Sequence, residues 1–221
     1  MKNPQHFETR AVGRLRHGRS RRATLLALGS AMSLAGHSLA ATSTWSGATD
    51  EFWSTAGNWD VAPVSGDDLV FTGVTNSFCE NDLDTDVGGS FVVNSITFDA
   101  GAGDGFDFFE LDGNPIDISG KTITNDSTTQ HDIYIPLKST GAGLTVAGDG
   151  DLLLDALEPG GGGPPFVKDG GGTVYVDGTT NSWALTLNAG KVVWSENQLW
   201  PSVDLNGGTL EAAADNMIHF N

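Results

Sequence analysis

A short phrase recurs every 18 residues in the last third of the chain. Each copy joins a glycine, a Thr or Lys, and an apolar β-forming residue; the copies are Gly172–Val174, Gly190–Val192 and Gly208–Leu210. A strand rises about 3.3 Å per residue and usually spans about five or six residues, so such a unit predicts two or three short strands joined by turns. If the chain completes one rung of a coil in that length, equivalent residues lie about 4.8 Å apart in neighbouring rungs.

This period predicts internal columns of apolar side chains. Val174, Val192 and Leu210 would form one column, and Leu187 and Leu205, which have the same offset, would form another. Rungs that bury their faces against their neighbours make a solenoid, and glycine suits corners where the backbone needs positive φ. We therefore expect an all-β chain folded as a right-handed parallel β-helix with short rungs. The alternative is a β-sandwich of ordinary hairpins, whose turns come at similar intervals.

Short alternating segments fill the rest of the chain after residue 41. Apolar residues at spacing two, followed by Gly, Asn or Asp, predict strands and turns; the segments are 94–99, 116–120, 132–137, 143–148, 172–178, 183–190 and 203–208. Alternation places Trp183, Leu185 and Leu187 on one face. The Gly/Pro-rich segment 158–165 predicts a loop within one continuous sheet system.

Residues 1–40 differ from the rest of the chain. They hold seven of the 11 basic residues and one of the 28 acidic ones, and a short apolar stretch ends in Ser38-Leu39-Ala40 before Ala41. A basic segment, an apolar core and a small-residue exit predict a signal peptide over residues 1–40; a short anchor helix is the alternative. Arg21 and Arg22 give the segment some likeness to a twin-arginine signal, so both the Sec and the Tat route remain open. Either route places the rest of the chain outside the cell or on its outer surface.

Charge and cysteine content restrict the partners. Beyond residue 40 four lysines face 27 acidic residues, a formal net charge of −23. Such a body repels nucleic-acid phosphates and anionic lipid heads, and we expect no membrane-spanning segment in it. Cys79 is the only cysteine, so no intrachain disulfide is available.

The segment that follows the signal carries a recognisable pattern. It has the form T-W-x-G, then W-S-x-x-x-N-W, then P-x-x-G-D and an apolar pair before Phe; the matching positions are Trp45, Gly47, Trp53, Asn58, Trp59, Pro63, Gly66, Asp67, Val70 and Phe71. Residues 168–194 resemble a repeat of the form K-x-G-x-G-T-L with an N-A-G-T-L close, with Val174 and Val176 in place of leucines and Lys191 in place of the threonine.

These motifs resemble secreted bacterial proteins that carry autotransporter-associated β-strand repeats. The resemblance covers about residues 42–221 and is weaker between 100 and 160. It implies a β-helical stalk or passenger over 41–221, with an N-terminal cap and first rungs over 41–100, and no enzymatic activity. The translocator barrel and the Pro-Glu-Pro sorting segment of such proteins do not follow the match, so we expect further repeats or another chain to cover the C-terminal edge.

Two acidic segments are candidates for calcium. Asp82, Asp84 and Asp86 alternate, but an EF-hand loop needs Gly and Glu where Val87 and Val93 stand, so we favour a strand with its aspartates in solvent. Asp104 and Asp107 lie in a single Gly-Asp-Gly-Phe-Asp-Phe phrase that resembles a β-roll calcium repeat, which requires successive copies. No cofactor is expected, and calcium is the one metal that these segments suggest.

The aromatic and titratable residues leave three function hypotheses. Trp45, Trp53 and Trp59 could cap the first rung or stack on sugars, and we favour the cap. His131 and His219 lack metal-ligand spacing, and the pair Asp149 and Asp151 is not a sufficient signature of a polysaccharide-active enzyme. We expect a structural, exported module without catalysis. The alternatives are a carbohydrate-binding module, whose partner would be a cell-surface or matrix polysaccharide, and a polysaccharide-active β-helix enzyme.

Overall fold

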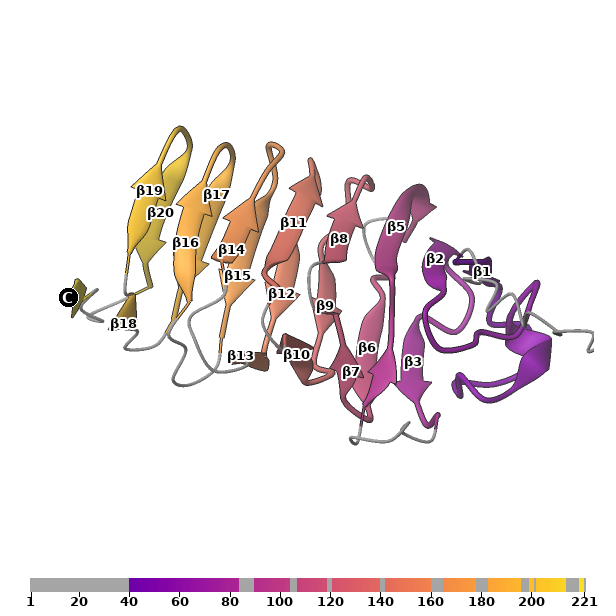
Figure 1. Ribbon diagram of the computed structural model, residues 1–221. Helices are drawn as coiled ribbons and strands as arrows, with labels where there is room; N and C mark the ends of the chain where they lie inside the picture. The colour runs from indigo at the N-terminus through magenta and orange to yellow at the C-terminus, as the bar shows by residue number, and fades with distance from the viewer. Residues whose placement is uncertain are drawn as a thin grey trace, which may run out of the picture. The chain divides into compact units, whose positions relative to one another are not determined.

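The fold is a parallel β-solenoid, as the repeat predicts. The computed structural model describes residues 40–83, 90–103, 107–118, 121–139, 142–159, 165–177, 183–195, 199–200, 202–213 and 219–220. Within the compact unit that begins at Ser38, the strands follow one another in a row in chain order (Figure 1). The signal peptide expected over residues 1–40 lies outside the described residues except for Ala40.

Three sheets run along the solenoid and a fourth lies near its C-terminal end. Sheet 1 contains β1 (Thr42–Trp45), β2 (Asp68–Gly73), β5 (Ser95–Ala102), β8 (Lys121–Asn125), β11 (Leu144–Gly148), β14 (Pro165–Lys168), β16 (Ala184–Leu187) and β19 (Val203–Leu205). Sheet 2 contains β3 (Phe78–Asn81), β6 (Glu110–Gly113), β9 (His131–Ile133), β12 (Leu152–Leu154), β15 (Thr173–Val176), β17 (Lys191–Trp194) and β20 (Thr209–Ala212).

The remaining elements are short. Sheet 3 contains β4 (Phe91–Val92), β7 (Ile116–Asp117), β10 (Leu137–Ser139) and β13 (Leu157–Pro159), and the fourth sheet pairs β18 (Leu199–Trp200) with β21 (His219–Phe220). A 3₁₀ turn, η1 (Ala56–Asn58), lies between β1 and β2. The segment 158–165, predicted as a loop, includes strand residues at both ends, because β13 ends at Pro159 and β14 begins at Pro165; residues 160–164 lie outside the described residues.

The register between strands confirms the predicted column. Val174 pairs with Val192 and Val192 pairs with Leu210, all in parallel strands, and Leu152 extends the column by one rung. Leu152, Val174 and Val192 are buried, and Leu210 packs partly buried against the core. The named strands pair with their neighbours in parallel, which a sandwich of hairpins would not allow.

The short period found in the sequence belongs to the last rungs only. Ile96 pairs with Ile123, Leu144 pairs with Phe166 and Leu185 pairs with Val203, so the offset between paired strands shrinks along the chain. The early rungs have longer strands in sheet 1, such as β2 and β5, and longer connections between the sheets. Leu187 pairs with Leu205 as predicted, but Leu205 is 60% exposed and is not internal, because it lies on the last rung of sheet 1.

Glycines form a column of their own at the corner between sheets 1 and 2. Gly148, Gly170, Gly190 and Gly208 have φ of 94°, 76°, 71° and 76°, so they adopt the left-handed region that other residues avoid. A Cβ on Gly170 would lie 2.2 Å from the carbonyl oxygen of Gly148, and a Cβ on Gly190 would lie 2.5 Å from that of Gly170. The corner therefore needs glycine both for its φ and for the close approach of the rung beneath.

We predict that Gly170→Ala destabilises the fold more than Gly73→Ala. Gly73 turns the same corner at the first rung with a φ of 70°, but nothing lies within 4 Å of the place that a Cβ would occupy. The Gly73 variant should lose about 1–2 kcal/mol from left-handed strain, and the Gly170 variant about 1–3 kcal/mol more because its methyl meets backbone. Urea unfolding followed by circular dichroism measures both, and equal losses would contradict the close-packing explanation.

Candidate functional site

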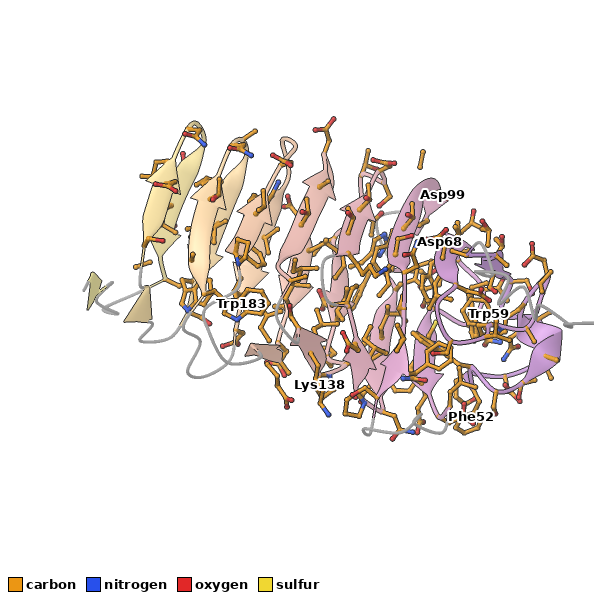
Figure 2. All side chains as sticks on the ribbon, in the orientation of Figure 1. Phe52, Trp59, Asp68, Asp99, Lys138 and Trp183 are labelled. Carbon is orange, nitrogen blue, oxygen red and sulfur yellow. The ribbon has the colours of Figure 1, made fainter. Side chains whose placement is uncertain are left out.

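The three N-terminal tryptophans meet in one buried cluster. The ring centroids of Trp45 and Trp59 are 4.9 Å apart and those of Trp53 and Trp59 are 5.9 Å apart, both edge to face. All three rings also contact Phe71 of the first rung, at centroid distances of 5.8–6.2 Å. Figure 2 shows Trp59 at the N-terminal end of the row of strands. Edge-to-face packing of this kind stabilises a core beyond the burial of area.

The burial of the three tryptophans determines whether a ligand could contact their rings. Trp45 and Trp53 are 0% exposed and Trp59 is 5% exposed. The Trp45 indole N–H donates to the Asn76 carbonyl (3.2 Å) and the Trp59 indole N–H to the Trp53 carbonyl (2.9 Å). A sugar stacks on an accessible ring face, and these rings present none. The packing on Phe71 therefore accounts for the tryptophans as part of the core at this end.

Asn58 organises the loop that carries Trp53 and Trp59. Its side-chain amide donates to Asp50 Oδ1 (2.7 Å) and to the Phe52 carbonyl (2.9 Å), and its Oδ1 accepts from the backbone N–H groups of Thr49 (2.8 Å) and Asp50 (3.1 Å). The side chain is completely buried. The asparagine of the W-S-x-x-x-N-W motif thus satisfies buried polar groups and fixes the loop.

Two aspartates secure the first strand. Asp60 accepts from the Thr44 N–H through Oδ1 (2.7 Å), and this hydrogen bond lowers its pKa. Asp67, the acid of the P-x-x-G-D motif, is buried and accepts from the N–H groups of Ala41 (3.1 Å) and Val64 (2.9 Å). Both carboxylates hold backbone in place around β1.

Two of the five calcium candidates, Asp82 and Asp107, fall among the described residues. Asp82 lies just after β3 and its carboxylate accepts from the Ser54 N–H (2.8 Å) and hydroxyl (2.5 Å), so it ties the cap loop to the first rung. Asp107 interacts with another group of the protein. Asp84, Asp86 and Asp104 lie outside the described residues. Within the described part of the chain, no group of three or more His, Cys, Asp or Glu side chains is placed to hold a metal ion.

The acid pair considered for polysaccharide chemistry also contacts backbone. Asp149 accepts from the Gly171 N–H (2.9 Å) and Asp151 from the Thr173 N–H (2.6 Å), each across to the next rung. A second acidic group lies on the outer face of sheet 2, where burial, Asp177 and Asp112 raise the pKa of Asp155. Asp149 and Asp151 therefore tie one rung to the next through backbone N–H groups.

His131 forms a buried polar cluster that sequence reasoning missed. Its Nδ1 accepts from the Phe109 N–H (3.0 Å), its Nε2 lies 2.9 Å from the Ser127 hydroxyl, and its ring stacks on Phe98 at 4.4 Å. Burial lowers its pKa to about 4. The spacing Asn125, Ser127, Thr129, His131 at a corner is the signal that could have revealed it. His219 lies in β21.

Ser127 and His131 lie as close as the nucleophile and the general base of a catalytic pair, but their hydrogen bonds do not fit those roles. Because Nδ1 accepts a backbone N–H, the neutral ring carries its proton on Nε2 and donates toward Ser127. The Ser127 hydroxyl in turn donates to Asn125 Oδ1 (2.8 Å) or the Thr129 carbonyl (3.0 Å). A base must accept the proton of its nucleophile. Both side chains are also buried, so the cluster provides hydrogen-bond partners for the backbone groups of this corner.

Lys168 is a second buried polar residue that the sequence did not single out. It is 1% exposed, and its ammonium donates to the backbone carbonyls of Asp169 and Gly170. Burial lowers its pKa, and the nearby carboxylate of Asp169 opposes that shift. The alternation Phe166-Val167-Lys168 places it on the inward face. The lysine that opens the K-x-G-x-G-T phrase therefore satisfies the carbonyls of the glycine corner.

We predict that Asn58→Ala lowers the free energy of unfolding by about 3 kcal/mol, because four hydrogen bonds disappear and buried partners are left unsatisfied. Asn206→Ala is the matched control. The Asn206 side chain is exposed and its amide donates to Asn188 Oδ1 (2.8 Å), so its loss should be under about 1 kcal/mol. Urea unfolding measures both, and similar losses would show that Asn58 is not central to the cap.

We predict that His131 makes the protein acid-sensitive. The pKa of His131 is about 4 in the folded protein, below the ordinary 6.5. The unfolded chain therefore binds a proton at higher pH than the folded protein does, and the free energy of unfolding falls as the pH drops from 6.5 through 4. The change is about 3 kcal/mol for a shift of this size. Against His131→Phe, the wild type should lose that much more over this interval in urea unfolding. Parallel pH profiles would refute the assignment, whatever the absolute stability of the variant.

The comparisons with known proteins found no match to this chain. No family model matches the chain, and no curated protein or solved structure matches it. Among the described residues, no helix has the length and apolar character that crossing a membrane requires.

Proposed function

We propose that the chain is an exported structural module of the bacterial cell surface, a stalk that acts by stacking rungs and carries no catalytic centre. The observation that supports this most is the use made of the opening motif. Trp45, Trp53 and Trp59 are core residues, and Asn58 and Asp67 bind backbone. Side chains that a binding or catalytic site would present to solvent are used here to close the first rung.

The buried polar groups of the interior also support a structural role. The buried polar groups at the corners, Asn125, His131 and Lys168, each bond to backbone or to one another. Repeat proteins of this kind are stabilised by contacts between neighbouring rungs, and a length of stacked rungs can hold two points apart without binding anything between them. The acidic surface suits such an element outside the cell, because it keeps the module soluble.

We predict that bacterial cells export the chain and remove residues 1–40. The basic segment and apolar stretch should direct export, and the small residues before Ala41 should be cleaved. Mass spectrometry of cytoplasmic, periplasmic and medium fractions should find a mature N terminus at Ala41. Replacing Arg21 and Arg22 with lysines separates the routes, since a twin-arginine signal should fail and a Sec signal should not.

An intact chain that begins at Met1 and stays in the cytoplasm would contradict export. A glycan array probed with the mature chain tests the absence of a ligand. We expect no binding above background, and binding would favour the carbohydrate-binding hypothesis at a surface other than the buried tryptophans.

A further inference from the structure

A row of three polar side chains joins neighbouring rungs where the strands of sheet 1 begin. Lys121 Nζ donates to Asn94 Oδ1 (2.7 Å), and the Asn94 amide Nδ2 donates to Asp68 Oδ1 (2.6 Å). The Ser95 hydroxyl donates to the same Asp68 oxygen (2.6 Å) and so holds the carboxylate in place. An amine, a carboxamide and a carboxylate thus lie in contact at the starts of β8, β5 and β2.

The register of the parallel strands makes this row a fixed feature of the fold. Asp68 pairs with Ser95, and Ser95 pairs with Thr122. Asn94 therefore lies opposite Lys121 on the adjoining rung, although the two residues are 27 positions apart in the chain. Neighbouring strands are about 4.8 Å apart, and the two side chains span that distance in contact.

Lys121 stands at the end of a buried apolar column. Its partner on the next rung is Leu144, and Phe166 and Leu185 continue the column; all three are at most 1% exposed. The Lys121 side chain and its hydrogen bond to Asn94 are themselves partly buried. Restricted access of water favours reaction between two groups that are held together, because water competes less for the amine and the amide.

Two other lysines show what sets this one apart. Lys168 is buried, but its ammonium contacts the backbone carbonyls of Asp169 and Gly170. Lys191 is paired with the Glu211 carboxylate. Attack on a peptide carbonyl would have to break the chain, and attack on a carboxylate would have to expel hydroxide. A carboxamide beside an acid can expel ammonia instead.

We propose that Lys121 and Asn94 are joined by an isopeptide bond that the folded chain forms by itself, with Asp68 transferring the proton. Lys121 first loses one proton to water. The Nζ lone pair then forms a bond to Asn94 Cγ, the bond from Cγ to Nδ2 breaks, and Asp68 moves one proton from Nζ to the departing Nδ2. The ammonia released takes up the proton first lost, so an ammonium and a carboxamide become a substituted amide and an ammonium ion. No oxidant or cofactor enters this balance.

The geometry suits this attack. Cγ is bonded to Oδ1, so Nζ is at most one C=O bond, about 1.2 Å, farther from Cγ than from Oδ1. Rotation about the flexible lysine stem brings Nζ from the plane of the amide to its face. Well-aligned groups react at effective concentrations of about 10⁵–10⁸ M, and departure of ammonia prevents the reverse step. The chain has one cysteine, so this bond gives it a cross-link between rungs that an intrachain disulfide cannot.

Mass spectrometry of the purified folded chain tests the proposal, and the test is independent of export and of a stalk function. The intact mass should fall below the mass given by the sequence by one ammonia. A digest that cuts after glutamate should contain one species in which peptides 81–110 and 111–158 are joined through Asn94 and Lys121. Trypsin should fail to cleave the unfolded chain after Lys121, because an amidated lysine is not a substrate, but should cleave after Lys191.

Three variants separate the roles. Lys121→Arg keeps the charge but removes the nucleophile and should give no joined peptides, whereas Lys191→Arg, the matched control, should keep them. Asp68→Asn keeps the shape and removes the proton carrier, so the joined fraction should grow about 10²–10⁴-fold more slowly.

Circular dichroism establishes that each variant is folded, and where one is not, the wild type alone decides. Separate peptides and free cleavage after Lys121 in the wild type would overturn the proposal. So would a loss of ammonia that maps to Asn206, where the following glycine permits succinimide formation, without joined peptides. Equally fast joining in Asp68→Asn would overturn the role given to Asp68.

Discussion

The parallel backbone ladder between rungs is the interaction on which the rest of the structure depends. Each strand of sheets 1 and 2 takes its register from the strand one turn earlier, so Val174, Val192 and Leu210 lie in one line. Once register is fixed, every apolar side chain meets its counterpart at the interstrand distance of about 4.8 Å. A short rung with few core residues becomes stable because the same contact repeats along the chain.

Corners are where this repetition is hardest to maintain, and the chain handles them in two ways. In the later rungs glycines turn left-handed directly over one another, close enough that a Cβ would meet backbone. At earlier corners the buried side chains of Asn125, Ser127 and His131 hydrogen-bond to backbone and to each other. Lys168 lies at the transition, with its ammonium bonded to the carbonyls of Asp169 and Gly170 at a glycine corner. Backbone groups at a buried corner have no water and need such partners.

The sequence predicted the parts of this fold that repeat. The constant offset between the last three phrases led to the column through Val192 and the strands from β15 onward, because equal spacing maps directly onto register. It could not show that earlier rungs are longer, because their longer strands and connections do not repeat the 18-residue spacing. Nor could it show that Ser127 and His131 meet, because their contact depends on how one corner folds. The roles of Asn58 and Asp67 were hidden for the same reason: most of their partners are backbone groups, which carry no sequence signature.

The change in rung length has a consequence for how such a gene can vary. Between β14 and β19 successive rungs are nearly equal in length. An in-frame duplication or loss of one such unit in this region would join strands that already match. The rungs between β2 and β8 also match one another, because Ile96 pairs with Leu69 and with Ile123 at the same spacing, so a unit of their length fits there and not among the shorter rungs. Recombination can therefore lengthen or shorten this molecule within either stretch of equal rungs, but not across the rungs between β8 and β14, where the spacing falls.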